Sequence, residues 1–279
     1  MTGGALRGLS DNDIIFLLET VEPRLIAMIE TIKGDPRMIE GILEQENEKL
    51  FRRIMFLGEA EILTKISPRL LFEVLLRRTL SELQSQSYTV ERTASQKIPV
   101  FDTRDVVEFL NQKMVLGYLA DMLSSFTRIE SFTLPMRVRK GIWRKIRFSD
   151  MDVDSLVRFC ETVDEEYRFG FYKRIADVCL FILGMFPEYV RHDFRYPLSG
   201  EIRPRIGEKW RRSVEDYEKE GRRFYKLAGG HRDASLLKLS EVLWQLHERF
   251  GLARKPLNFI SDNFLHFKKQ ELFPWVSSN

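Results

Sequence analysis

The chain has 279 residues, of which 44% are hydrophobic and 30% charged, and its formal net charge is +3. This length supports one large domain or two of ordinary size, and the composition excludes a chain that stays disordered for lack of apolar side chains. The two cysteines, Cys160 and Cys179, fit neither a disulfide framework nor a zinc-binding spacing. We therefore predict a globular protein with reduced thiols.

The sequence shows no sign of export or of membrane insertion. Its first residues contain no basic segment followed by an apolar core and a cleavage site, so we expect no secretory signal. The apolar run at 178–186 is nine residues long, whereas a membrane-spanning helix needs about 20. We expect a cytoplasmic protein without a transmembrane segment.

Helical signals dominate the first part of the chain. Ser10 with Asp13 three residues later resembles a capping box in which Asp replaces the usual Glu. The segment 67–86 starts with Ser67, a favoured N-cap, and Pro68, which is favoured in the first helical turn. This segment is apolar on more than half of its circumference, so we predict that it is the central helix of an N-terminal lobe.

Residues 87–102 carry the clearest strand signal. Two short runs rich in β-forming residues, 88–91 and 98–101, flank the polar tetrad TASQ, which predicts a small β-hairpin. A helix followed by a hairpin resembles the wing of a winged-helix domain, but the preceding helix is too apolar to lie in a DNA groove. We therefore expect the hairpin to cap the N-terminal lobe, and a further helix to begin at Thr103.

Basic residues are concentrated at 136–147, which holds six of them and no acidic residue. Pro135 and Gly141 interrupt the helical pattern in the same region, so we expect a boundary there. The domains that we predict are an N-terminal helical lobe with the hairpin at 1–130, a basic connector at 131–150 and a C-terminal helical lobe at 151–279.

The C-terminal lobe has three strong helical patterns. The segment 175–186 is apolar on nearly all sides, which predicts a helix enclosed by its neighbours. The segments 206–230 and 233–251 each place apolar residues on one helical face. The fold class that we predict is all-α, with two packed helical lobes and one small β-hairpin at about 87–102.

The common catalytic and cofactor motifs are absent. The sequence contains no Walker-type phosphate loop, no GxGxxG after a strand and no GxSxG elbow. It also lacks the paired Glu-x-x-His elements that bind two iron ions in helical bundles. We therefore expect no cofactor and no metal, and no motif links the chain to a known family.

Our first functional hypothesis is a binding or regulatory protein that engages an anionic partner, with nucleic acid as the first candidate and an acidic protein as another. The basic segment interleaves cations with aromatic residues, a composition that neutralises phosphates and stacks on bases. Its structural alternative is that the arginine stems pack over a neighbouring lobe. Two arginine pairs, about three helical turns apart, lie further along the chain. The candidate residues are Arg137, Arg139, Lys140, Trp143, Arg144, Lys145, Arg147, Arg211, Arg212, Arg222 and Arg223.

The second hypothesis is a helical enzyme with an acidic pocket between the lobes. Its candidate residues are Glu161, Asp164, Glu165 and Asp177, with Glu166 in the same cluster. Carboxylates crowded in this way can raise one another's pKa, although such a cluster is also typical of a solvated helix face. A buried Asp177 needs a partner, because an unpaired ion inside a protein is costly. Lys173 and Arg174 are the nearby candidates, and the sequence leaves open whether the protein is an enzyme.

The third hypothesis is a structural subunit of a larger protein assembly. The helix predicted at 236–250 and the aromatic segment at 255–267 offer apolar surfaces through which the C-terminal helices would form an oligomer or an assembly.

Cys179 has no histidine beside it in the sequence, so we interpret it as a packed apolar side chain and not as a nucleophile.

Overall fold

The computed structural model describes residues 9–57, 59–92, 97–128, 131–139, 142–149, 151–187, 190, 212–265 and 269–273. The chain divides into two compact units. The first unit comprises Met1–Thr127 with Lys255–Glu271, and the second comprises Arg128–Arg254 with Leu272–Asn279. Within the described ranges, no helix has the length and apolar character needed to cross a membrane.

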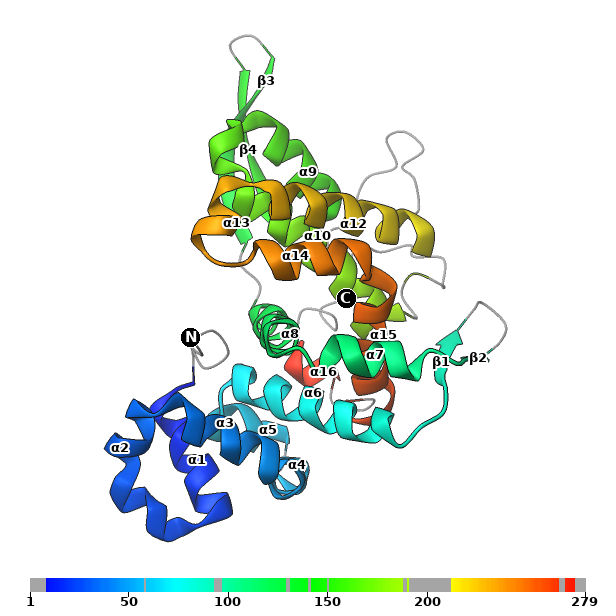
Figure 1. The fold of residues 1–279 in the computed structure, drawn as a ribbon. Coiled ribbons are helices and arrows are strands. Elements are labelled where there is room, and N and C mark those ends of the chain that lie inside the picture. The colour runs from blue at the N-terminus through cyan, green and yellow to red at the C-terminus, as the bar shows by residue number, and fades with distance from the viewer. Residues whose placement is uncertain are drawn as a thin grey trace. The chain divides into compact units, whose positions relative to one another are not determined.

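The first unit is mainly helical (Figure 1). Its α-helices are α1 (Asp11–Val21), α2 (Ile29–Gly34), α3 (Pro36–Gln45), α4 (Asn47–Phe56), α5 (Glu59–Lys65), α6 (Pro68–Gln84), α7 (Thr103–Leu110) and α8 (Lys113–Ser125). A 3-10 helix covers Pro23–Met28, and a hairpin is formed by β1 (Thr89–Arg92) and β2 (Lys97–Val100). Towards the C-terminus, α15 (Phe250–Asn263) and α16 (Lys269–Leu272) each run from one unit into the other.

The helix starts of α1 and α6 are joined by one buried carboxylate. Ser10 and Asp13 form the expected capping box, in which the Ser10 hydroxyl accepts from the Asp13 N–H and Asp13 accepts from the Ser10 N–H. Asp13 also accepts a 2.7 Å hydrogen bond from the backbone N–H of Ser67, the N-cap of α6. A local capping motif is thus extended into a contact between two helices.

Helix α6 is the centre of the first unit, as predicted, and it packs against α4, α7 and α8. It also carries charges in the interior. Glu73 lies between Arg69 and Arg77, one helical turn away on each side, and binds both. Arg77 reaches Glu40 of α3 at 2.9 Å. Burial alone raises the pKa of Glu40, but the charges and hydrogen bonds of Arg77 and Lys113 together outweigh it and hold that pKa below its usual value.

The β1–β2 hairpin confirms the strand prediction for 87–102. It is attached to α15 by Lys255, a buried lysine that binds Asp102 and lies 3.1 Å from both Thr89 Oγ1 and Glu91 Oε1. Two carboxylates and a hydroxyl around one ammonium give it the partners that a buried charge requires.

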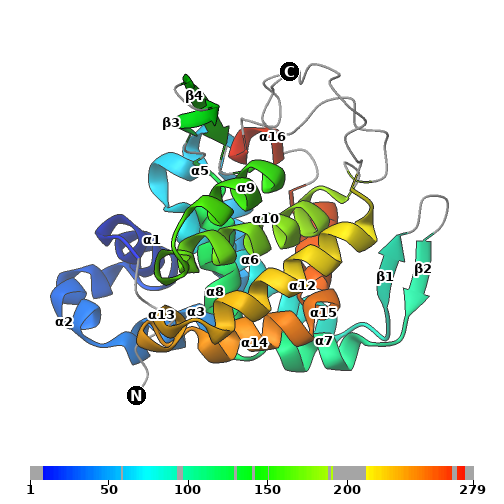
Figure 2. The ribbon, with the colours of Figure 1, turned by 90° about the horizontal axis from the view of Figure 1, so that it is seen from above.

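The second unit also consists mainly of helices. It contains α9 (Val153–Thr162), a 3-10 helix (Glu165–Tyr167), α10 (Phe169–Met185), α12 (Val214–Gly230), α13 (Arg232–Leu236) and α14 (Ser240–Glu248). Helix α12 packs against both α10 and α14, and the three helices lie side by side in Figures 1 and 2. The run from Ile175 to Phe186 is buried throughout, which confirms the enclosed helix that its composition predicts.

Residues 131–139 and 142–149 form a second pair of strands, which we did not predict. Strands β3 (Ser131–Arg139) and β4 (Ile142–Ser149) are antiparallel, and β4 contacts α9. The all-α prediction with a small hairpin at 87–102 is confirmed, and this additional ribbon lies within the stretch that we interpreted as a basic connector.

A glycine allows the close crossing of α10 and α12. A Cβ built on Gly221 would lie 2.5 Å from Phe250 Cε2, which is closer than side chains approach, and 3.0 Å from Cys179 Cβ, which is a tight contact. We predict that Gly221→Ala destabilises the protein by about 1–3 kcal/mol through overpacking. In α10, a Cβ on Gly170 meets nothing within 4 Å, so Gly170→Ala serves as the control. Its expected effect lies between none and a gain of about 1 kcal/mol. Urea denaturation measures both, and equal effects would contradict this packing.

Candidate nucleic-acid interface

The register of β3–β4 sorts the basic segment into two faces. Residues alternate between the faces along a strand, and directly paired residues share a face. The pairs Thr133↔Arg147, Pro135↔Lys145 and Arg137↔Trp143 therefore lie on one face. The pairs Phe132↔Phe148, Leu134↔Ile146 and Met136↔Arg144 lie on the other. We call Arg137, Trp143, Lys145 and Arg147 the basic face.

The register does not assign every candidate cation to the basic face. Arg144 belongs to the opposite face, with the apolar residues. The pairing shifts by one residue between Arg137 and Arg139, where an irregularity interrupts the alternation, so Arg139 is not assigned to a face. Lys140 lies outside the described residues.

The basic face is compact along the ribbon. Lys145 and Arg147 are two positions apart on one strand, a rise of about 6.8 Å. Arg137 is paired directly with Trp143, and such partners have Cα atoms about 4.5–5.5 Å apart. Three basic residues and one tryptophan thus occupy register positions on one face of a short length of ribbon.

The arginines of and beside α12 are paired with carboxylates. Arg212 donates to Asp154 at 2.7 Å, and this pair raises the pKa of the arginine although burial acts to lower it. Arg222 lies 3.6 Å from Glu218, and Arg223 lies 3.3 Å from Glu220. Arg211 is outside the described residues. The charges of Arg212, Arg222 and Arg223 are therefore largely balanced within the chain.

Asp177 is buried and paired. Its side chain is 1% exposed and accepts hydrogen bonds from the Tyr225 hydroxyl at 2.8 Å and from Lys173 Nζ at 2.7 Å. Lys173 is one of the two partners that the sequence suggested. Lys173 and Asp177 both belong to α10, so their ion pair is local, and the Tyr225 hydroxyl of α12 makes the link between the two helices.

The other acidic candidates lie on the surface. Glu161, Asp164, Glu165 and Glu166 are exposed. Glu165 accepts from the Tyr172 hydroxyl at 2.9 Å and lies 3.0 Å from Arg168 Nη1. Burial raises the pKa of Tyr172, and the hydrogen bond to Glu165 acts in the same direction. Within the described ranges, no three His, Cys, Asp or Glu side chains are grouped so that they could hold a metal ion.

Both cysteines are buried among other side chains. Burial raises the pKa of the Cys160 thiol and, more strongly, that of Cys179. A raised pKa keeps a thiol protonated and therefore a poor nucleophile. This agrees with the interpretation of Cys179 as a packed apolar side chain.

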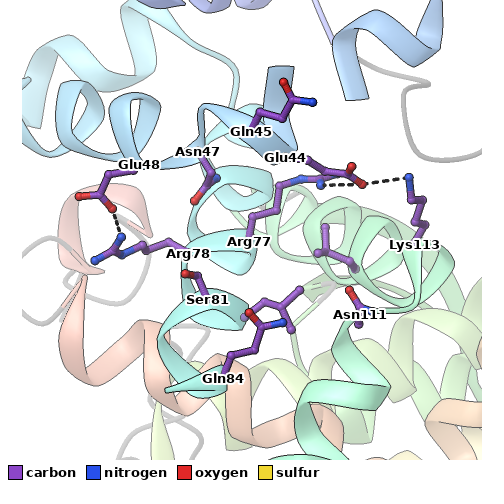
Figure 3. Close-up of a pocket in the computed structure, with 12 residues that line it drawn as sticks. Glu44, Gln45, Asn47, Glu48, Arg77, Arg78, Ser81, Gln84, Asn111 and Lys113 are labelled. Atoms are coloured by element: carbon purple, nitrogen blue, oxygen red, sulfur yellow. Dashed lines mark ion pairs between the residues drawn. The ribbon is translucent and has the colours of Figure 1, made fainter. Parts of the chain in front are cut away.

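The first unit contains a polar pocket of about 400 Å³ that the sequence analysis missed (Figure 3). Its walls come from α3, α4, α6 and α8 and from the residues next to them. Each of its cations lies against a carboxylate: Lys113 is 3.0 Å from Glu44, Arg77 is 3.9 Å from Glu44, and Arg78 binds Glu48. An anionic ligand would therefore compete with carboxylates that are already present. On these helices Glu and Arg residues lie one helical turn apart, and this spacing is the sequence pattern that could have indicated the pocket.

Comparisons of the chain with protein-family models, with curated proteins and with solved structures found no match. No relative therefore assigns a role to a residue of the basic face or to Asp177. The evidence that bears on function is the strand register, the burial of the acidic residues and the pairing of the arginines.

We predict that Tyr225→Phe destabilises the protein by about 1–3 kcal/mol, because it removes a hydrogen-bond donor from the buried Asp177 carboxylate. Tyr167→Phe is the matched control, since that tyrosine is exposed and should change stability by no more than about 0.5 kcal/mol. Urea denaturation at neutral pH provides the measurement. A negligible effect of Tyr225→Phe would contradict the role of this hydroxyl.

Proposed function

We propose that the protein binds nucleic acid through the basic face of the β3–β4 hairpin. The observation that carries the proposal is the register, which assigns Arg137, Lys145, Arg147 and Trp143 to one face of the ribbon. Lysine and arginine neutralise backbone phosphates and release counterions. A two-stranded ribbon is also one of the elements that fits the major groove of DNA, which is about 12 Å wide.

Trp143 makes single-stranded nucleic acid the favoured ligand. Unpaired bases expose their faces, and an aromatic side chain beside cations can stack on a base while the cations contact the backbone. By register, Trp143 is paired with Arg137 and lies two positions from Lys145. A duplex keeps its bases stacked, so it can use the cations of this face but gains less from the indole.

The pairing of the other arginines supports the choice of the hairpin. Arg212, Arg222 and Arg223 each have a carboxylate within the second unit. An external phosphate would have to compete with those carboxylates, which lowers the gain from binding. For this reason the α12 arginines are at most a secondary part of the proposed interface.

Fluorescence anisotropy tests the proposal directly. Labelled single- and double-stranded DNA and RNA would be titrated with the full chain at low and at near-physiological salt. We expect tight binding at low salt that weakens steeply as salt rises, with a slope that reports the number of phosphate contacts. Absence of binding to all four ligands at low salt would contradict the proposal and would favour an acidic protein as the partner.

We predict different effects for two neighbouring cations of β4. Lys145→Ala should weaken binding and reduce the steepness of the salt dependence by about 0.7 on a single strand, the contribution of one phosphate contact. Arg144→Ala removes the same charge from the opposite face, so it should leave the slope unchanged. Anisotropy titrations at several salt concentrations distinguish the two variants. Equal slopes for both variants would show that only overall charge matters.

We predict that Trp143→Leu weakens binding to single strands by about 5- to 150-fold, which corresponds to the 1–3 kcal/mol of one stacked base. Binding to duplex should change much less. Phe148→Leu is the matched control, because the register assigns Phe148 to the opposite face. Thermal unfolding of both variants checks that they fold, and an equal loss of affinity in both would contradict stacking on Trp143.

A further inference from the structure

Four large apolar side chains are exposed in the stretch of chain that runs from the end of α12 through α13 into α14. They are Leu227, Leu236, Leu237 and Trp244. The adjacent residues Leu236 and Leu237 are 66% and 59% exposed, so most of each side chain faces solvent. Grouped apolar side chains at a surface mark sites that bind another surface.

The two leucines are held on a closed turn. The N–H of Leu239 donates to the carbonyl of Ala234 at 2.8 Å, and the N–H of Lys238 donates to that of Ser235 at 3.1 Å. This is the hydrogen-bond pattern of a Schellman motif, whose left-handed position is usually glycine. Here it is Lys238, with a φ of 59°. The turn therefore presents a leucine pair and a lysine together, in a backbone conformation that costs a lysine energy.

The surrounding helices pack tightly at this end of α12. The Ser240 hydroxyl donates to the carbonyl of Gly229 at 2.8 Å. The Trp244 ring lies 3.2 Å from the position that a Cβ on Gly229 would take. Trp244 thus lies beside the end of α12 that leads into α13, and its ring is still partly exposed.

Three cations accompany the apolar residues. Lys226 precedes Leu227, Arg232 lies one helical turn before Leu236, and Lys238 follows Leu237. All three cations are exposed, and none of them is in an ion pair with another described residue. They differ in this from Arg222 and Arg223, which are paired with glutamates of the same helix. Their charges are available to an anionic partner.

We infer that this region docks on an anionic lipid surface. We call it the leucine tip and define it by Lys226, Leu227, Arg232, Leu236, Leu237, Lys238 and Trp244. A lipid surface accepts a protruding apolar pair without a shaped groove, and tryptophan is favoured at its interface with water. Lysine and arginine are attracted to its anionic headgroups. These residues are separate from the basic face, so the inference does not rest on nucleic-acid binding.

Vesicle co-sedimentation of the full chain is the test. The vesicles contain phosphatidylcholine alone or phosphatidylcholine with phosphatidylserine. We expect binding to the mixed vesicles, and a loss of about tenfold or more in the Leu236→Ser, Leu237→Ser double variant, because both apolar side chains are removed. Phe56→Ser is the control for nonspecific hydrophobic binding to the vesicles, since Phe56 is 88% exposed on α4. It should bind as the unchanged protein does.

The charge contribution needs its own pair of variants. Reversal of Lys226, Arg232 and Lys238 to glutamate should weaken binding to phosphatidylserine vesicles by about 100-fold or more, given a factor of about five for each of the three cations near such a surface. Reversal of the exposed residues Arg37, Lys65 and Arg104 of the first unit changes net charge equally and should have a much smaller effect. Both triple variants have the same net charge and an unchanged basic face. We therefore expect them to bind nucleic acid with equal affinity.

Several results would overturn the inference. One is the absence of vesicle binding by the unchanged protein, and another is an equal loss in the leucine and Phe56 variants. Binding of a labelled polyglutamate peptide that requires Leu236 and Leu237, without vesicle binding, would assign the tip to an acidic polypeptide. A dimer in sedimentation velocity that disappears in the double leucine variant would assign it to a second copy of the chain. Nucleic-acid binding in the anisotropy assay is independent of all these outcomes.

Discussion

The structure depends on one constraint: each charge taken into the interior needs a partner of opposite charge or hydrogen-bond donors that satisfy it. In the first unit, Arg69, Glu73 and Arg77 alternate along α6 at intervals of one turn, and Lys255 holds the β1–β2 hairpin through Asp102. In the second unit, Asp177 is enclosed by Lys173 and Tyr225. The contacts of Lys255 with Asp102 and of Tyr225 with Asp177 join segments far apart in the sequence, so they help to specify which elements pack together. The other pairs lie within single helices, and the apolar side chains supply the driving force.

The same constraint identifies charges that serve the fold. Cations that have a carboxylate, such as Arg212 with Asp154, contribute mainly to the fold. Asp177 likewise has the contacts of a structural ion pair and no adjoining metal-binding group in the described part of the chain. Two further groups of cations are the basic face of β3–β4, which the register defines, and the cations of the leucine tip, which form no ion pair with another residue that the structure describes. The two proposals concern these two groups.

The sequence was sufficient where a structure depends on neighbouring residues. The capping pair Ser10 and Asp13, the N-cap Ser67 and the hairpin at 87–102 all follow from local patterns, and the structure confirms them. The second hairpin was missed for two reasons. Pro135 and Gly141 resemble breaks in a helix, and Arg144 interrupts the apolar residues Ile142 and Ile146 at alternate positions of β4, so the strand pattern was not recognised. The contact of Lys255 with Asp102 spans 153 positions, and no local pattern indicates such a pairing.

Hydrogen–deuterium exchange with and without a bound single-stranded oligonucleotide tests the central claim most directly, because it locates the interface without any substitution. The account predicts slower exchange of backbone amides in β3 and β4 when the oligonucleotide is bound, with little change along α12. Protection confined to α12, to the pocket of the first unit or to the leucine tip, with β3 and β4 unchanged, would contradict it.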